Sequence, residues 1–346
     1  MSEEILKPQS FIKKIASFIK NRGFEMENLT LIVPSDRAAN QLRVEIAKTF
    51  AKPVFAPTIQ TIDKWMKPSE LHVLDETRQL LSLYEISAGV PGVPNENFEE
   101  FLTWGKIALR DFSEIDRYLL DATKVFKNLA SIKELESWQI DEADYSESQK
   151  KFLNFWKVLP DLYTSFHLKL DQKKQTTPGR AYRVFAETTH DFLDPEAKQY
   201  FVFAGFNALT KAELVSIKKI LELKKGVFLS DSDLFYINDN LHEAGGFLRK
   251  NHEFLETVYQ PDPINVLLNK ELNAKIIECA QHIGQVKVAA NELSKLSSSE
   301  IGKTLVLLCD EALIGSMIHH IPANVNKTNL TLGLPLTQTS VKSWID

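Results

Sequence analysis

The sequence predicts an α/β protein whose parallel sheet is interrupted by a long helical block. Short apolar runs typical of buried strands alternate with amphipathic helical stretches in residues 10–65, and again from residue 199 onward. Between them, residues 68–197 show mostly helical periodicity. Alternation of strands with helices favours a parallel sheet, because each parallel connection needs a crossover. A length of 346 residues fits two or three domains.

The first segments show this alternation most clearly. Residues 10–24 have apolar residues at helical spacing, with Ser10 as the expected N-cap and Gly23 as the expected stop. Residues 29–35 predict a buried strand and residues 36–50 a helix. We expect that helix to face inward with Ala38, Leu42, Ile46 and Phe50. Residues 53–57 predict a second short strand, which leads into the stretch TIQTIDKWM.

The helical block and the second alternation follow in order. Long helices are predicted at 75–87, 98–138 and 148–170. The chain then predicts a strand at 199–206, a helix closed by Gly226 and a strand from Val227. Further on we expect strands at 264–269, 304–310 and 329–334, with a long helix to about Leu296 and another to about Ile321. The predicted domains are therefore 1–66 with 198–262, an inserted 67–197, and 263–346.

Composition limits the classes of function. The net charge of −5 excludes the global basicity of many nucleic-acid-binding proteins, so any such contact needs a local basic surface. Cys279 and Cys309 have no metal-ligand spacing and form no disulfide framework. The polar start is unlike a signal peptide, and no apolar run approaches a membrane span. We expect a cytoplasmic protein without membrane contact.

The stretch GKTLVLLCDE, Gly302 to Glu311, has the letters of a nucleotide site in the wrong order. A phosphate loop lies after a strand and before a helix, whereas GKT here precedes the predicted strand. On such a strand, Lys303 and Asp310 would lie roughly 23 Å apart at opposite edges of the sheet. One Mg-nucleotide needs both groups at the same edge. We interpret this stretch as structural.

Other sequence patterns that match catalytic, metal-binding or phosphate-binding sites are equally weak evidence for such sites. Asp161 after Pro160, and Asp171 with Lys173, match the letters of a PD-(D/E)xK nuclease, but their stretch is helical in period. Asp111, Glu114, Asp116 and Asp121 are interpreted as a charged helix face with N-capping. Basic residues gather in three places, which are either solvated faces or a phosphate-contact surface: Lys13, Lys14, Lys20, Arg22; Lys173, Lys174, Arg180, Arg183; and Lys218, Lys219, Lys224, Lys225.

The order of motifs resembles a known family. Five stretches are similar to segments of AddB-type proteins, which are inactivated superfamily I helicase-like proteins of double-strand-break repair. In chain order they are LTLIVPSDRAANQLRVEI, APTIQTIDKWM, DFSEIDRYLLDATKVFKNL, FVFAGFNALTKAE and TLVLLCDEALIGSMIHHIP…NLTLGLPL. The resemblance spans most of the chain. It implies a RecA-like lobe (P-loop NTPase-like) with an inserted helical subdomain, followed by a partial second RecA-like lobe. It also implies that this chain is an N-terminal fragment of a longer protein ending in a PD-(D/E)xK nuclease.

Two departures from active helicases matter. No phosphate loop precedes LTLIVPS, and Ala204 and Gly205 stand where the acids of the DExx box would be. Without these groups, phosphoryl transfer lacks its electrostatic machinery. We therefore expect no ATP or magnesium cofactor, no metal site and no catalytic residue in this chain.

The resemblance implies a non-catalytic scaffold that binds single-stranded DNA or unwinding duplex, and it suggests an AddA-type helicase-nuclease subunit as a partner. In active relatives, loops after the sheet strands contact the DNA strand. The residues that match those loops are Ser35, Arg37, Gln60, Thr61, Phe206 and Asn207. Ser35 has the alternative role of helix cap, and Phe206 that of core residue. Two other functions stay open: an active ATP-dependent helicase or nuclease subunit, and a protein-interaction module that assembles a repair complex.

Overall fold

The computed structural model describes residues 10–50, 53–136, 147–192, 196–256 and 273–331, together with 258, 265, 267, 333, 336 and 339–345. The chain divides into two compact units, residues 1–270 and residues 271–346. The fold of each unit is described by itself.

A four-stranded parallel sheet organises the first unit, as the alternation of strands and helices predicts. Its strand order is β2 (Thr58–Thr61), β1 (Leu29–Val33), β5 (Tyr200–Ala204), β6 (Gly226–Leu229). Val33 lies opposite Thr61, and Ile32 lies opposite Phe203. The carboxyl ends of the strands therefore meet at one edge of the sheet, which we call the carboxyl edge.

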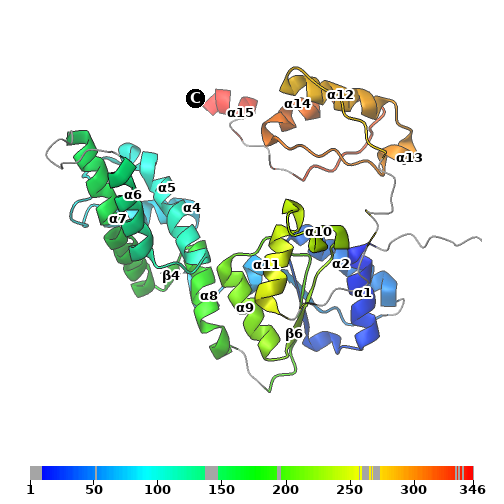
Figure 1. The fold of residues 1–346 in the computed structure, drawn as a ribbon, viewed down its shortest axis with the longest axis horizontal. Coiled ribbons are helices and arrows are strands. Elements are labelled where there is room, and N and C mark those ends of the chain that lie inside the picture. Colours follow the sequence, from blue (N-terminus) through cyan, green and yellow to red (C-terminus); the bar gives the residue numbers. More distant parts are fainter. Residues whose placement is uncertain are drawn as a thin grey trace, which may run out of the picture. The chain divides into compact units, whose positions relative to one another are not determined.

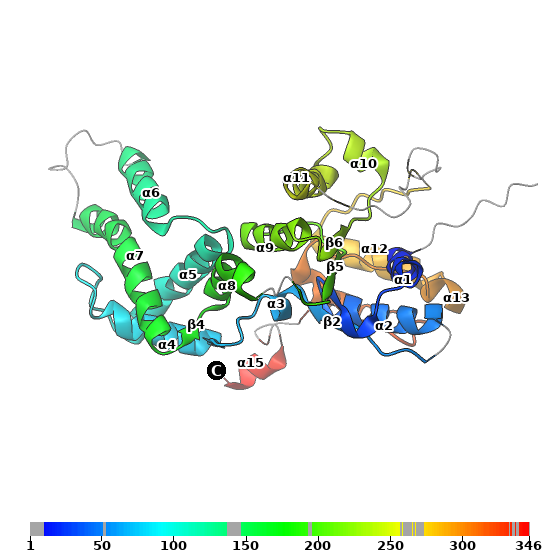
Figure 2. The ribbon, with the colours of Figure 1, turned by 90° about the horizontal axis from the view of Figure 1, so that it is seen from below.

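Helices cover both faces of this sheet (Figures 1 and 2). Helices α1 (Phe11–Arg22) and α2 (Asp36–Phe50) share one core cluster with Leu31 and Val33 of β1. Ile32 points to the opposite core, which is formed with α3 (Ile62–Trp65), α8 (Pro178–Phe192), α9 (Lys211–Glu222) and α11 (Gly246–Leu255). All five residues of β1 are buried, as expected for a strand covered on both faces.

A helical block lies between β2 and β5 in sequence. It contains α4 (Glu76–Ser87), α5 (Phe98–Arg117), α6 (Ala122–Glu136) and α7 (Glu147–Gln172). Its core holds the fully buried rings of Phe101, Phe112, Phe126 and Phe166. Two short strands, β3 (His72–Val73) and β4 (Gln175–Thr176), pair in parallel beside these helices. Asp75 caps α4, and Asn97 forms a capping box with Glu100 at the start of α5.

Helix α8 belongs to both the block and the sheet layer. At its start, a Cβ on Gly179 would lie 2.6 Å from Cα of Ser113 in α5, so the two helices approach closely there. One turn later, Tyr182 and Ala186 are buried in the core beneath the sheet, together with Phe203. The packing of the sheet thus includes residues well before position 197, where the sequence places the end of the inserted block.

Three local predictions in this unit need correction. The second strand begins at Thr58, not in residues 53–57; Pro53 and Pro57 have no N–H to donate to a strand ladder. The helix predicted over 98–138 is two helices, α5 and α6. They are separated by a turn in which Leu119 has a φ of 54°. The predicted helix closed by Gly226 ends earlier, because Gly226 is the first residue of β6.

The second unit is a small helical assembly in the part of it that the structure describes. Its helices are α12 (His282–Ser294), α13 (Ser298–Ile301), α14 (Ile314–His319) and α15 (Ser340–Ile345). Val286, Leu293 and Met317 form its buried core. The long helix predicted to about Leu296 begins only at His282.

The strands predicted in this second unit are not formed among its described residues. Residues 304–308 are irregular, and Leu305 and Leu307 are 83% and 78% exposed. Residues 329–331 and 333 are also irregular. A strand needs a neighbour to satisfy its N–H and C=O groups, so an apolar run alone does not make one. Most of the strand predicted at 264–269 lies outside the described residues. Among the described helices of the chain, none combines the length and the apolarity that a membrane crossing requires.

Candidate nucleic-acid interface

The six residues predicted to contact DNA lie around the carboxyl edge of the sheet. Ser35 and Arg37 follow β1, Gln60 and Thr61 end β2, and Phe206 and Asn207 follow β5. These three strands are neighbours in the sheet, and Val33 of β1 lies opposite Thr61 of β2. The fold therefore brings the three pairs, from segments far apart in sequence, to one edge.

Their exposure divides them into two groups. Ser35, Arg37 and Asn207 are exposed, and Gln60 is half-buried. Thr61 and Phe206 are only 6% and 7% exposed. The Phe206 ring packs at 6.3 Å from the ring of Phe228 inside the core. As placed, Phe206 offers no free face on which a base could stack.

Two of the exposed residues also organise the edge. The Ser35 hydroxyl accepts a hydrogen bond from the Ala38 amide at 3.2 Å, so Ser35 caps the start of α2. The carbonyl of Asn207 accepts a hydrogen bond from the buried side-chain amide of Asn251 at 2.6 Å. The first contact fixes the loop after β1, and the second fixes the loop after β5.

Between β1 and β5 lies the point where the chain changes direction along the sheet. Helix α2 carries the chain from β1 to β2 on one side, whereas β5 and β6 lie on the other. In open α/β sheets, ligands bind outside the carboxyl ends of the strands at such a point. Gly205 directly follows β5 here with a φ of 86°, and a Cβ on it would lie 3.6 Å from Pro34. The residue that follows β1 is Pro34, and the loop after it is not a glycine-rich phosphate loop.

Charged groups extend the exposed side of this edge. Lys64 of α3 donates to the Asp36 carboxylate of α2 at 2.7 Å, and both side chains are exposed. Such an exposed pair contributes little to stability. It places the Lys64 ammonium, paired with the Asp36 carboxylate, next to the chain neighbours Ser35 and Arg37.

The structure also brings further polar residues to the far end of this edge. Lys14, buried in α1, lies 3.7 Å from the Asp231 carboxylate after β6. The His252 ring lies 3.0 Å from the buried Ser230 hydroxyl, and burial lowers the pKa of His252. The polar stretch SDSD directly after a strand was the available signal for Ser230 and Asp231. Lys14 was among the basic residues predicted on the first helix. His252 comes from a distant helix and had no such signal.

Among the residues that the structure describes, the most deeply buried charged side chain is that of Asp116 in the helical block, away from this edge. Asp116 is fully buried; it accepts hydrogen bonds from Arg183 Nε at 2.7 Å and from the Tyr163 hydroxyl at 2.6 Å. His167 Nε2 lies 3.2 Å from its second oxygen, at ion-pair distance without hydrogen-bond geometry. Burial alone raises the pKa of Asp116, but His167, Tyr163 and Arg180 outweigh it and hold this pKa below the usual value. The prediction of a charged helix face is therefore wrong for Asp116.

Several residues of the predicted basic clusters contact other parts of the fold. Lys20 donates to the Thr49 carbonyl, Lys219 to the Ala186 carbonyl and Lys225 to the Ala197 carbonyl, and Lys218 pairs with Glu256. Arg180 and Arg183 face Asp116. Lys13, Lys173, Lys174 and Lys224 of the same clusters are exposed. For these side chains, both a solvated face and a phosphate-contact surface stay open.

The remaining chemical patterns do not converge. Asp161 and Asp171 lie on the single helix α7, as their helical period predicts. Lys303 lies in a turn after α13, while Asp310 caps the short helix at Glu311–Leu313. Among the residues that the structure describes, no three His, Cys, Asp or Glu side chains are grouped so as to hold a metal ion.

Comparison with protein-family models and with curated proteins found no match.

Proposed function

We propose that this chain is a non-catalytic, helicase-like scaffold that binds DNA and serves a nuclease of double-strand-break repair. One observation carries the DNA-binding part: the loops after β1, β2 and β5 lie side by side at the carboxyl edge and present Ser35, Arg37, Gln60 and Asn207. Hydroxyl, guanidinium and amide groups are the donors that contact phosphate oxygens.

The assignment to a RecA-like lobe with an inserted subdomain rests on the motif order together with the observed topology. A parallel sheet with helices on both faces, interrupted between β2 and β5 by the helical block, is compatible with that layout. For residues 263–346, the start of a second lobe rests on the motif resemblance alone, because the described residues of this part pair no strands.

The absence of ATP chemistry is part of the same proposal. Pro34 follows β1, and β5 ends in Ala204 and is followed by Gly205, so neither strand end carries the lysine or the acids that phosphoryl transfer uses. An AddA-type subunit as partner rests on the resemblance.

Fluorescence anisotropy tests the DNA-binding part directly. The 346-residue chain is titrated against labelled single-stranded, forked and duplex DNA at several salt concentrations. We expect single-stranded and forked DNA to bind more tightly than duplex, with an affinity that falls as salt rises because phosphate contacts release counterions. Absent or salt-independent binding would contradict a phosphate-contacting edge. DNA-stimulated phosphate release that disappears in Lys303→Ala would favour the ATP-dependent alternative.

A further inference from the structure

Helix α10 (Leu234–Asn238) carries large apolar side chains that belong to none of the core clusters. Leu234, Phe235, Tyr236 and Ile237 follow one another, and each of them is half-buried. In the following segment, Leu241 is 93% exposed and Phe247 is 53% exposed. Scattered exposed apolar residues are ordinary, whereas a contiguous group marks an interaction site. Residues 233–247 are called the α10 surface below.

The α10 surface is held in one shape by its own contacts. Arg249 donates hydrogen bonds to the carbonyls of Tyr236, Asn240 and His242, and these bonds hold the loop after α10 against α11. A Cβ on Gly245 would lie 2.0 Å from the Tyr236 oxygen, so only glycine allows this approach. A surface ordered before binding loses less entropy when a partner docks.

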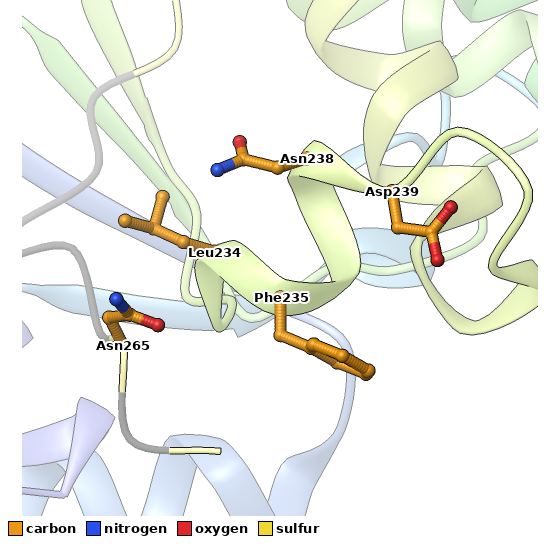
Figure 3. Close-up of a pocket in the computed structure, with 5 residues that line it drawn as sticks. All are labelled: Leu234, Phe235, Asn238, Asp239 and Asn265. Carbon is orange, nitrogen blue, oxygen red and sulfur yellow. The ribbon is translucent and has the colours of Figure 1, made fainter. Parts of the chain in front are cut away.

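A pocket lies within this surface (Figure 3). It has a volume of about 290 Å³ and is lined by Leu234, Phe235, Asn238, Asp239 and Asn265. Four of these residues belong to α10 or directly follow it, and Asn265 comes from a separate segment beside the helix. The volume is small for a drug-sized ligand and suits one or two side chains.

The charge around the pocket selects the kind of occupant. Asp239 and Glu243 are exposed on the α10 surface, while the guanidinium of Arg249 is turned to backbone carbonyls. Lys250, on the following helix α11, is exposed. This arrangement repels phosphate and attracts cations. An aromatic ring such as that of Phe235 adds a favourable face for a lysine or arginine side chain.

We propose that the α10 surface is a docking site for a cationic, apolar segment of a partner protein. Apolar side chains of that segment cover Leu234, Phe235 and Leu241. Its lysines or arginines pair with Asp239 and Glu243. This interface is separate from the proposed DNA contacts after β1, β2 and β5, and it does not depend on them.

Peptide binding to the whole chain tests this site. The probes are a labelled amphipathic helical peptide of lysine and leucine, and a matched peptide of glutamate and leucine. We expect saturable binding of the lysine peptide alone. The double substitution Asp239→Lys with Glu243→Lys weakens it at least about tenfold, a difference of roughly 1.4 kcal/mol. Leu241→Ser with Phe247→Ser, which removes apolar contact without changing charge, also weakens it.

A matched charge change elsewhere separates docking from general attraction. Glu85 and Glu99 are exposed on the helical block, so Glu85→Lys with Glu99→Lys alters the net charge equally. We expect this pair to leave the peptide affinity unchanged. Absent or non-saturable binding, equal binding of both peptides, or equal weakening by the control pair would overturn the proposal. Photocrosslinking of oligothymidylate to residues 233–247 would also overturn it, because the surface would then accept nucleic acid.

Discussion

The phenol of Tyr182 donates a hydrogen bond to the Asp63 carboxylate across 119 residues of sequence. The guanidinium of Arg117 lies over the same ring at 4.2 Å. One buried tyrosine of α8 thus joins α3, which follows the sheet strand β2, to α5 of the helical block. Burial and the bond to Asp63 raise the pKa of Tyr182, so the phenol stays protonated as a donor.

Removing this hydroxyl tests how firmly the helical block is joined to the sheet. We expect Tyr182→Phe to lower the free energy of unfolding by about 1.5 kcal/mol, because the lost bond ends on a charged group. Asp63 is exposed and regains water, which limits the loss. Chemical denaturation measures the change. Tyr118→Phe, at an exposed ring, serves as the control; an equal effect of both substitutions would contradict the assigned role of Tyr182.

The close crossing of α5 and α8 gives a second prediction. We expect Gly179→Ala to destabilise the chain by about 1–3 kcal/mol, because the new methyl would lie 2.6 Å from Cα of Ser113. Gly315→Ala is the matched control: Gly315 is also the second residue of a helix, and a Cβ there meets nothing within 4 Å. That substitution should be neutral or slightly stabilising. Thermal unfolding of both variants measures the change in stability. A Gly179→Ala variant as stable as the wild type would show that α5 and α8 do not approach so closely.

The buried Asp116 predicts a pH dependence of stability. Its folded pKa lies below the unfolded value of about 3.9. Its ionised form therefore stabilises the fold above about pH 4, and this contribution is lost as the pH falls through the folded pKa. We expect Asp116→Asn to cost about 3 kcal/mol near neutral pH, since it leaves Arg183 without its charged partner.

The measurement is the stability difference between wild type and Asp116→Asn from pH 7 to pH 3. This difference should shrink as the pH falls. Asp111→Asn, on the same helix but with a half-exposed side chain, should leave the pH dependence unchanged. A difference that stays constant with pH would mean that Asp116 is not held ionised by its neighbours.

The sheet of the first unit could largely be predicted from sequence. The strands β1, β5 and β6 are apolar runs bounded by turn residues, and α1 and α2 have clear helical periods. Gly23 ends α1 in the left-handed conformation that its position predicts, with a φ of 65°. Local patterns suffice here because each element buries a face of its own.

The errors come from contacts between residues far apart. The break between α5 and α6 is stabilised by Arg183, which donates to the carbonyls of Ile115 and Leu120 from more than sixty residues away. Asp116 looked like one of several surface acids, because its buried partners lie on α7 and α8. The strand predicted at 304–310 fails for the opposite reason, since its apolar pattern is present without a paired neighbour.

The candidate site was predicted in part. The sequence placed Ser35, Gln60 and Asn207 after apolar runs, and the register explains why these positions share one edge. It did not reveal that Phe206 is buried, because a ring after a strand can face either the solvent or the core.

Arg37 offers a direct test of phosphate contact at this edge. We expect Arg37→Ala to weaken single-stranded DNA binding several-fold and to reduce the slope of log affinity against log salt by about 0.7. Arg110→Ala removes an equally charged, exposed side chain from the helical block and should change neither quantity. An unchanged salt slope in Arg37→Ala would remove Arg37 from the interface.

Photocrosslinking most directly tests whether DNA runs over the carboxyl edge. A single-stranded oligonucleotide carrying a photoreactive thymine analogue is bound to the 346-residue chain, irradiated, and the labelled peptides are identified by mass spectrometry. The account predicts labelling in the segments that contain Ser35 to Arg37, Gln60 to Thr61 and Phe206 to Asn207. Labelling confined to the helical block, to the α10 surface or to residues 271–346, with these three segments unlabelled, would contradict it.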